Sequence, residues 1–177
     1  MNQTKSLLHV ALMAALIIIL GLMPPIPLGF IPVPIVLQNM GIMLAALLLG
    51  AKKGSLAILV FLILGLFLPV FTGGNTTFAV LAGPTAGYVL AWLLVPAALA
   101  GLRQCFSSSH PLVIFGLVWL SGVLMVAVIG SIYLSHYTHT PLLTSLLSNL
   151  IFIPGDTIKA LIATLIGTKY RKQLGLD

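Results

Sequence analysis

Long apolar runs that are almost free of charge most limit what this chain can fold into. The 177 residues include only two acidic and eight basic residues, and 60% of the chain is hydrophobic. A soluble domain carries roughly 25% charged residues, far more than the 6% found here. Since a helix that crosses a bilayer needs about 20 mainly apolar residues, the runs predict an all-α integral membrane protein.

Polar and proline-rich breaks divide the chain into six expected spans. They cover residues 7–23, 35–50, 55–70, 78–101, 111–134 and 141–168. The breaks between them are rich in Pro, Gly, Ser and Asn, residue types that interrupt helices. We therefore expect residues 1–177 to form a single six-helix membrane domain, in which the first run is retained and is not a cleaved signal peptide.

The positions of the basic residues predict how these helices are oriented. Lys5, Lys52, Lys53 and Arg103, with the basic cluster after residue 168, all lie at the termini or in alternate connections. Because Lys and Arg concentrate on the cytoplasmic side of membrane proteins, both termini are expected in the cytoplasm. The remaining connections then share the outer side, where we expect the ligand pocket to open. The same rule explains the net charge of +6 without nucleic acid as a partner.

One internal acidic residue lies within the last span. Asp156 occurs in the sequence IFIPGDTIKA, three positions before Lys159, so the two side chains share a helix face. A carboxylate near the bilayer centre costs about 2.5–3.5 kcal/mol on insertion scales, and such residues are functional by default. A purely structural ion pair is the alternative, although apolar residues often replace a buried pair without loss of stability. Pro154 and Gly155 are expected to open the helix beside a polar pocket.

Further polar residues near the outer side or within the spans are candidates for lining that pocket. Gln38 is expected to begin the second span, and Tyr88 to lie about three turns into the fourth span if that helix starts near Phe78. Hydrogen bonding between helices is the alternative role for each of them. The full set is Gln38, Asn39, Asn75, Thr76, Thr77, Thr85, Tyr88 and Asn149.

Motifs for metal binding and catalysis are missing from the sequence. His136 and His139 have a spacing that suits two metal ligands, but no Cys, Asp or Glu lies nearby to complete a set, so no metal site is predicted. The chain contains none of the common hydrolase, zinc-protease or phosphate-loop motifs. We therefore predict that the protein is not an enzyme, and that active transport would draw its energy from a partner or an ion gradient.

Four segments, PVPIVLQ, GLFLPVFTGG, LAGPTAGYVLAW and PGDTIK, occur in this order after a proline-rich hairpin. Together they resemble the biotin-binding S-components of energy-coupling-factor transporters, the BioY family, over nearly the whole chain. The chain departs from the family pattern at Ile35 and Val36, where the family usually has Phe and Thr. It also departs at residues 75–77, where the family usually has further glycines.

This resemblance implies high-affinity capture of biotin on the outer face of a bacterial cell membrane. Biotin is the transported ligand, and no cofactor is expected. It also implies partners, namely a transmembrane coupling protein and two cytoplasmic ATPase subunits. The family's first helix docks the coupling protein through a face of small residues. Ala11 and Ala15, spaced four apart on the first span, match that pattern.

For the ligand contacts, we expect Asp156 to accept hydrogen bonds from the ureido N–H groups of biotin. Asn75 and Lys159 would donate to the ureido carbonyl or to the valerate carboxylate, and such charge-assisted bonds are the stronger kind. The remaining candidates are Tyr88, Gln38 and Gly83, the last because a glycine allows close approach of the backbone.

Two other functions are open at the level of the sequence. A self-sufficient or proton-coupled vitamin carrier would use Asp156 as a proton site, and its uptake would collapse when the gradient is dissipated while ATP persists. A non-transporting scaffold subunit would have no affinity for a small molecule.

Overall fold

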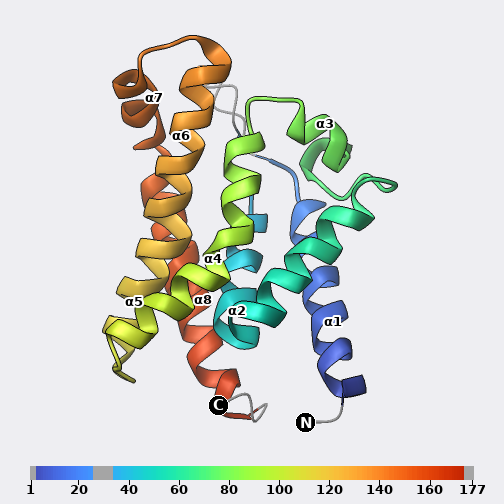
Figure 1. Ribbon diagram of the computed structural model, residues 1–177, viewed down its shortest axis with the longest axis vertical. Coiled ribbons are helices and arrows are strands. Elements are labelled where there is room, and N and C mark those ends of the chain that lie inside the picture. The colour runs from blue at the N-terminus through green and yellow to red at the C-terminus, as the bar shows by residue number, and fades with distance from the viewer. Residues whose placement is uncertain (1–2, 26–33, 174–177) are drawn as a thin grey trace.

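Helices carry nearly all the secondary structure of the computed structural model, which describes residues 3–25 and 34–173 (Figure 1). An isolated bridge pairs Phe71 with Asn75. The elements in chain order are α1 (Gln3–Gly21), α2 (Gln38–Leu64), η1 (Thr72–Gly74), α3 (Thr77–Leu81), α4 (Ala86–Cys105), α5 (Pro111–Trp119), η2 (Leu120–Leu124), α6 (Met125–Thr138), α7 (Leu142–Asn149) and α8 (Phe152–Gln173).

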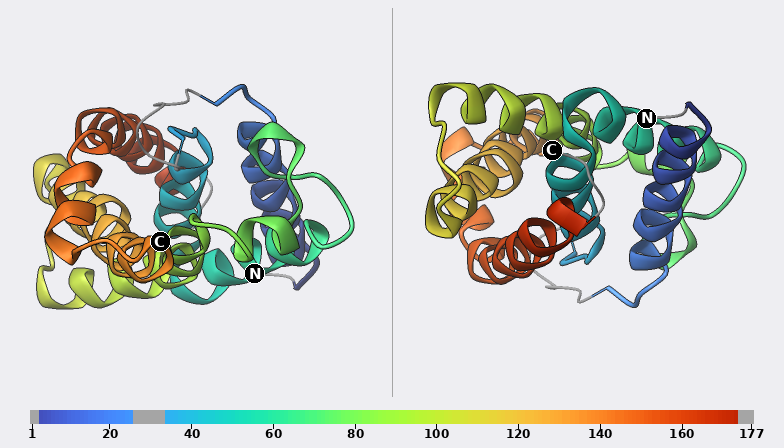
Figure 2. Two further views of the ribbon diagram at one scale, coloured as in Figure 1. Left: turned by 90° about the horizontal axis from the view of Figure 1, so that it is seen from above. Right: turned by 90° about the horizontal axis from the view of Figure 1, so that it is seen from below.

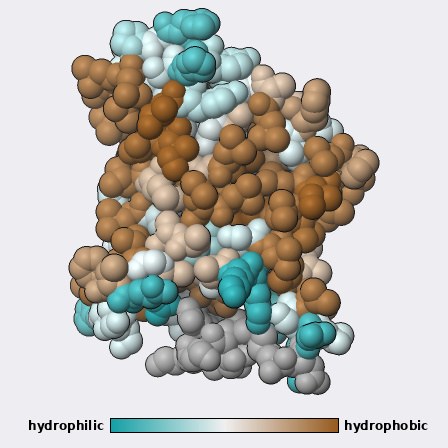
Figure 3. Space-filling model, viewed as in Figure 1, coloured by the Kyte–Doolittle hydropathy of each residue, from teal (hydrophilic) through white to brown (hydrophobic). Residues whose placement is uncertain are grey.

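The described helices are long and apolar enough for a membrane protein. Four qualify as candidate spans, namely α1, α2, α4 and the run of residues 111–138, and the bent pair of α7 and α8 raises the number to five. Figure 3 shows apolar residues around the middle of one face and polar residues towards its two ends. The prediction of an all-helical protein with membrane-spanning helices is therefore confirmed.

The helix α2 consists of two segments that meet at Gly50. Its φ of 71° and ψ of −169° fall in a region that only glycine adopts readily, and the segment before it descends in Figure 1 while the segment after it rises. These segments correspond to the expected spans 35–50 and 55–70. The expected end of the second of these spans, at residue 70, is wrong, because the helix ends at Leu64 and the chain then turns ahead of Pro69.

The fourth expected span is wrong at its start. Residues 78–101 do not form one helix, since α3 ends at Leu81 and α4 begins at Ala86. Pro84 explains the break, because proline disfavours the helical conformation of the residue before it. Tyr88 is consequently the third residue of α4 and does not lie three turns into a helix.

The last expected span also contains a break, but not at the predicted place. The pair α7 and α8 bends by 51° between Asn149 and Phe152, whereas Pro154 and Gly155 lie inside α8. Pro154 is the third residue of that helix, and the first N–H groups of a helix have no intrahelical partner in any case. A proline is therefore tolerated there without opening the helix.

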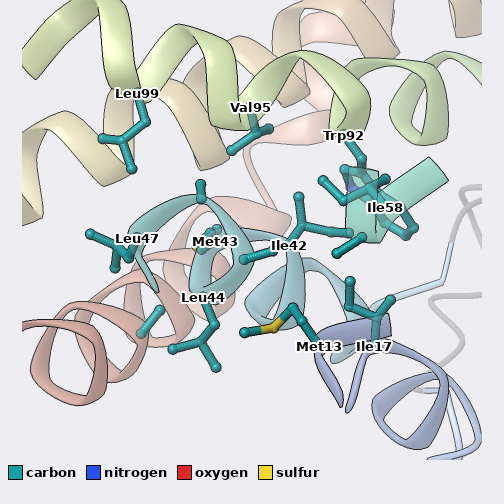
Figure 4. Close-up of a cluster of buried hydrophobic side chains, with 14 of the residues drawn as sticks. Met13, Ile17, Ile42, Met43, Leu44, Leu47, Ile58, Trp92, Val95 and Leu99 are labelled. Carbon is teal, nitrogen blue, oxygen red and sulfur yellow. The ribbon is translucent and has the colours of Figure 1, made fainter. Parts of the chain in front are cut away.

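The first segment of α2 lies at the centre of the helices. In Figure 2 it stands between α1 and α8, and α2 contacts α1, α4 and α8. Figure 4 shows side chains of this segment facing those of α1 and α4. The labelled residues are Met13 and Ile17 of α1, Ile42, Met43, Leu44, Leu47 and Ile58 of α2, and Trp92, Val95 and Leu99 of α4.

Candidate functional site

A cavity of about 320 Å³ is bounded by the beginnings of α2, α4 and α8, by the loop of residues 71–75 and by α6. These helix starts lie away from both chain termini in Figure 1. Most of the lining is apolar, and it comprises Pro34, Ile35, Val36, Phe71, Ala79, Val80, Pro84, Val89, Trp92, Val126, Ala127 and Phe152 together with a smaller set of polar residues. Small-ligand sites are usually of this kind, mainly apolar with a few polar groups that orient the ligand.

All six residues that the sequence assigned to ligand binding line this one cavity. They are Gln38, Asn75, Gly83, Tyr88, Asp156 and Lys159. The structure thus brings together residues of α2, α4, α8 and two connecting loops. Their contacts with a ligand stay a prediction.

Asp156 and Lys159 form an ion pair at the cavity. The Lys159 Nζ donates to Asp156 Oδ1 at 2.7 Å and to the carbonyl oxygen of Val36 at 2.7 Å. The side chains are 19% and 8% exposed for Asp156 and Lys159, so little solvent competes for them. Because Lys159 reaches the segment before α2, the pair also ties α8 to the start of α2. Among the described residues no hydrogen bond reaches Asp156 Oδ2, which leaves that oxygen available as an acceptor.

Tyr88 is held by a second polar group at the cavity. Asn149 Nδ2 donates to Tyr88 Oη at 2.7 Å and to Ser131 Oγ at 2.6 Å. The Tyr88 ring lies against Gly130, where a Cβ atom would be 2.2 Å from the ring. Asn149 also lines the cavity. The sequence noted Asn149 as a polar candidate, but its link to Tyr88 depends on the packing of α4, α6 and α7.

Gln38 has a structural contact as well as its place at the cavity. Its side chain is 1% exposed, and Nε2 donates to the carbonyl oxygens of Val70 at 3.0 Å and Ile17 at 3.4 Å. Gly21 makes this possible, because a Cβ there would lie 2.1 Å from the same Nε2. Gln38 therefore joins α1, the start of α2 and the loop before η1.

Asn75 is placed by the turn that precedes it. Gly73 and Gly74 both have a φ of 76°, a conformation that favours glycine. The Asn75 side chain then donates from Nδ2 to the Thr72 carbonyl at 3.0 Å. Asn75 is exposed and lines the cavity.

Four further polar residues line the cavity but were not assigned to the site by the sequence, namely Asn39, Thr72, Thr85 and Asn149. Asn39 and Thr72 line it, and their Oδ1 and Oγ1 atoms are buried without a hydrogen-bond partner. Asn39 was noted as a polar candidate and Thr72 was not. No sequence pattern distinguishes them, because the lack of partners is a property of the folded chain.

Ala11 and Ala15 lie on the exposed face of α1. The buried face of the same helix carries Val10, Ala14 and Ile17. The two alanines are therefore accessible to another helix and take no part in the contact of α1 with α2.

Comparison with known proteins gives consistent results over the whole chain. The model of the BioY family matches residues 1–176. The chain is 48% identical to the biotin transporter BioY of Lactococcus lactis subsp. cremoris, covering 99% of this chain and 95% of that protein. It is 38% identical to the biotin transporter BioY of Rhizobium etli, covering 93% and 92%. A solved structure, the S-component for biotin from an ECF-type ABC transporter, superposes with a TM-score of 0.91 at 47% identity, covering 97% of this chain and 95% of that one.

Proposed function

Because the chain belongs to the BioY family, we propose that it is a membrane subunit that binds biotin and serves its uptake. The observation that carries this proposal is the cavity itself, in which the Asp156–Lys159 pair is set into a mainly apolar lining. A structural pair would have no need of a cavity beside it, and an intramembrane ionisable group is by default functional.

The chemistry of the cavity suits biotin. Its ureido ring offers two N–H donors and one carbonyl acceptor, and its valerate chain ends in a carboxylate. We infer that Asp156 accepts from the ureido ring, and that Lys159 and Asn75 donate to the ligand's acceptors. Phe71 and Trp92, whose ring centroids lie 6.4 Å apart, belong to the apolar lining against which the bicycle would pack.

Gly83, Tyr88 and Gln38 complete the proposed contacts. A Cβ at Gly83 would meet only backbone oxygens of Ala79 and Val80, at 3.5 and 3.6 Å, so a ligand can approach this backbone closely. The Tyr88 hydroxyl is already oriented by Asn149. Gln38 contributes mainly through the position it gives to the start of α2.

We further infer one membrane domain over residues 1–177, with six crossings. These are α1, the two segments of α2, α4, the run of residues 111–138, and α7 with α8. Figure 1 places the start of α1, the end of α8, the turn of α2 and the α4–α5 connection at the same end. That end carries Lys5, Lys52, Lys53, Arg103 and Lys169, which supports a cytoplasmic location for it. The cavity would then open outward in a bacterial plasma membrane.

Uptake would be energised by partners. The proposed partners are a transmembrane coupling protein, which docks on α1 at Ala11 and Ala15, and two cytoplasmic ATPase subunits. The exposure of both alanines supports this, because small residues let helices approach closely in lipid.

Isothermal titration of the purified protein in detergent tests the proposal. We expect saturable binding of biotin with nanomolar affinity and one site per chain. A protein that is folded by circular dichroism yet releases no heat with biotin, and does not retain radiolabelled biotin, would contradict it.

A further inference from the structure

A second cavity, of about 210 Å³, is lined by Ala46 and Gly50 of α2 and by Leu99, Ala100 and Arg103 of α4. It shares no lining residue with the larger cavity. Gly50 forms the turn of α2, and Arg103 lies in the last turn of α4. The second cavity therefore lies at the end of the molecule where α2 turns and α4 leads into α5 (Figure 1).

The path of α2 along α4 explains why space is left between these helices. The chain reverses at Gly50, with a φ of 71°, and the segment that follows packs closely on α4. At Gly54 a Cβ would lie 3.1 Å from the Cβ of Pro96, which shows how near the two helices come. Beside this close contact the lining residues Ala46 and Ala100 are small, so the helices do not fill the space between them.

The lining combines small or apolar residues with one cation. Four of the lining residues carry no charge, and the fifth is Arg103, which is half-buried. A guanidinium has five N–H donors in a planar fork, so it can keep a contact within the protein and still bind a phosphate group. The ligand that suits this lining is amphiphilic, with an apolar part between α2 and α4 and an anionic oxygen group at Arg103.

The charge at this end of the molecule favours an anion. The chain has eight basic residues and two acidic ones. Lys52 and Lys53 directly follow the lining residue Gly50, whereas the internal acidic residue, Asp156, lines the larger cavity. Basic pockets between membrane helices bind the headgroups of anionic lipids. An anion that carries hydrocarbon chains gains from the apolar lining as well as from the charge, whereas a soluble anion gains from the charge alone.

We propose that the second cavity binds an anionic phospholipid, with the phosphate at Arg103 and part of an acyl chain against Ala46, Leu99 and Ala100. Long basic side chains near the ends of membrane helices reach the headgroup region, so Arg103 meets the phosphate where the bilayer supplies it. The site is separate from the one proposed for biotin, and the two can be tested independently.

Native mass spectrometry tests this site on the purified protein in micelles that contain equal amounts of phosphatidylglycerol and phosphatidylcholine with the same acyl chains. Arg103→Gln removes the cation, and Ala100→Leu fills the apolar part while it keeps Arg103. Two controls match these changes outside the lining. Lys5→Gln removes one charge at the start of α1, which lies apart from the α4–α5 connection in Figure 1. Ala97→Leu enlarges an exposed residue of α4.

We expect the parent and both controls to retain phosphatidylglycerol over phosphatidylcholine by about fivefold or more, a ratio equivalent to about 1 kcal/mol. Arg103→Gln should retain the two lipids equally. Ala100→Leu should retain less of both lipids, because its side chain occupies the place of the acyl chain. The biotin affinity should be the same in every variant.

Thermal unfolding distinguishes a lipid from a soluble phosphate and shows that each variant is folded. Phosphatidylglycerol should raise the unfolding temperature of the parent more than phosphatidylcholine does, and this difference should vanish in Arg103→Gln. Glycerol 3-phosphate, which has the phosphate but no acyl chain, should leave the unfolding temperature unchanged.

Four results would overturn the lipid site. They are equal retention of the two lipids by the parent, selectivity that persists in folded Arg103→Gln or is lost equally in Lys5→Gln, lipid retention by Ala100→Leu that equals that of Ala97→Leu, and stabilisation by glycerol 3-phosphate as large as by phosphatidylglycerol. The last result would assign the cavity to a soluble phosphate. In each case the measured biotin affinity still decides the proposed function on its own.

Discussion

The region around the first segment of α2 and the region that holds the cavity are built differently. In the first, Ile42, Met43 and Leu47 are almost completely buried. Helices approach them at glycines, since a Cβ at Gly122 would lie 2.7 Å from Met43 and one at Gly167 2.8 Å from Leu47. In the second, the backbone is interrupted by η1, by the break between α3 and α4, and by the bend between α7 and α8.

Polar groups follow the same division. The irregular backbone of the cavity region leaves space, and the ion pair, the Tyr88–Asn149 link and the unpaired atoms of Asn39 and Thr72 surround it. The difference teaches that stability and ligand binding depend on separate residues. Substitutions in the first region should change stability with little effect on affinity, whereas those in the cavity should change affinity.

The largest effect on stability is expected at the Asp156–Lys159 pair, which contributes both to stability and to the proposed ligand binding. Lys159→Met leaves the Asp156 carboxylate without its cation in a site where that side chain is only 19% exposed. Loss of one partner of a buried pair costs about 3–5 kcal/mol, so the free energy of unfolding in detergent should fall by that amount.

The double variant Asp156→Leu/Lys159→Met is the control for this prediction. Replacing both members of a buried pair with apolar residues is often neutral for stability, so most of the loss should be recovered while biotin binding is abolished. A double variant as unstable as Lys159→Met would show that the pair mainly holds the bundle together.

Ile42→Ala tests the central region. Ile42 is completely buried, and truncation of such a residue to alanine costs about 2–5 kcal/mol through lost contacts and the cavity left behind. We expect a lower free energy of unfolding and a biotin affinity, measured per folded molecule, within twofold of the parent. A large drop in affinity would break the separation of the two regions.

Gly50→Ala tests the turn between the two segments of α2. At a φ of 71° and a ψ of −169°, a non-glycine residue is strained by about 1–3 kcal/mol. Unfolding measurements should show that loss, and titration should show unchanged affinity. Gly101→Ala serves as the control, because Gly101 lies inside α4 with open space at its Cβ position. Equal free energies of unfolding for Gly50→Ala and the parent would show that the turn does not require a glycine.

The smallest effect on the isolated chain is expected from Ala11→Trp. The residue is exposed on α1, so neither stability nor biotin affinity should change. Association with the coupling protein should nevertheless be lost in a pull-down, because a bulky side chain keeps the two helices apart. Ala97→Trp, at another exposed position on α4, should leave the complex intact. Recovery of an intact complex with Ala11→Trp would remove α1 from the docking surface.

The sequence predicted the class of fold and much of the cavity for clear physical reasons. Uncharged apolar runs allow only membrane helices, and Gln38 indeed begins α2. The carboxylate Asp156 is conspicuous in an apolar run because burying it is costly. That reasoning led to the ion pair, and the search for polar residues near the outer side added Gln38, Asn75 and Tyr88. All of these residues lie at the cavity, together with Gly83.

The remainder depends on tertiary packing. The sequence Gly83–Pro84 signals a break, but an apolar run on both sides concealed it, so Tyr88 was placed too deep in its helix. The sequence predicted a break at Pro154 and Gly155, but the break lies just before them. Proline is tolerated in the first turn of a helix, so α8 continues through both residues. Asn39 and Thr72 stand out only because the fold leaves them without partners.

Titration of biotin into the parent protein and Asp156→Asn most directly tests whether the buried carboxylate holds the ligand. The amide keeps the size of the side chain but loses the negative charge that accepts the ureido N–H, so affinity should fall at least tenfold, equivalent to about 1.4 kcal/mol. Thermal unfolding checks that the variant is folded. If the folded variant binds biotin as tightly as the parent, Asp156 does not contact the ligand and the proposed site is wrong.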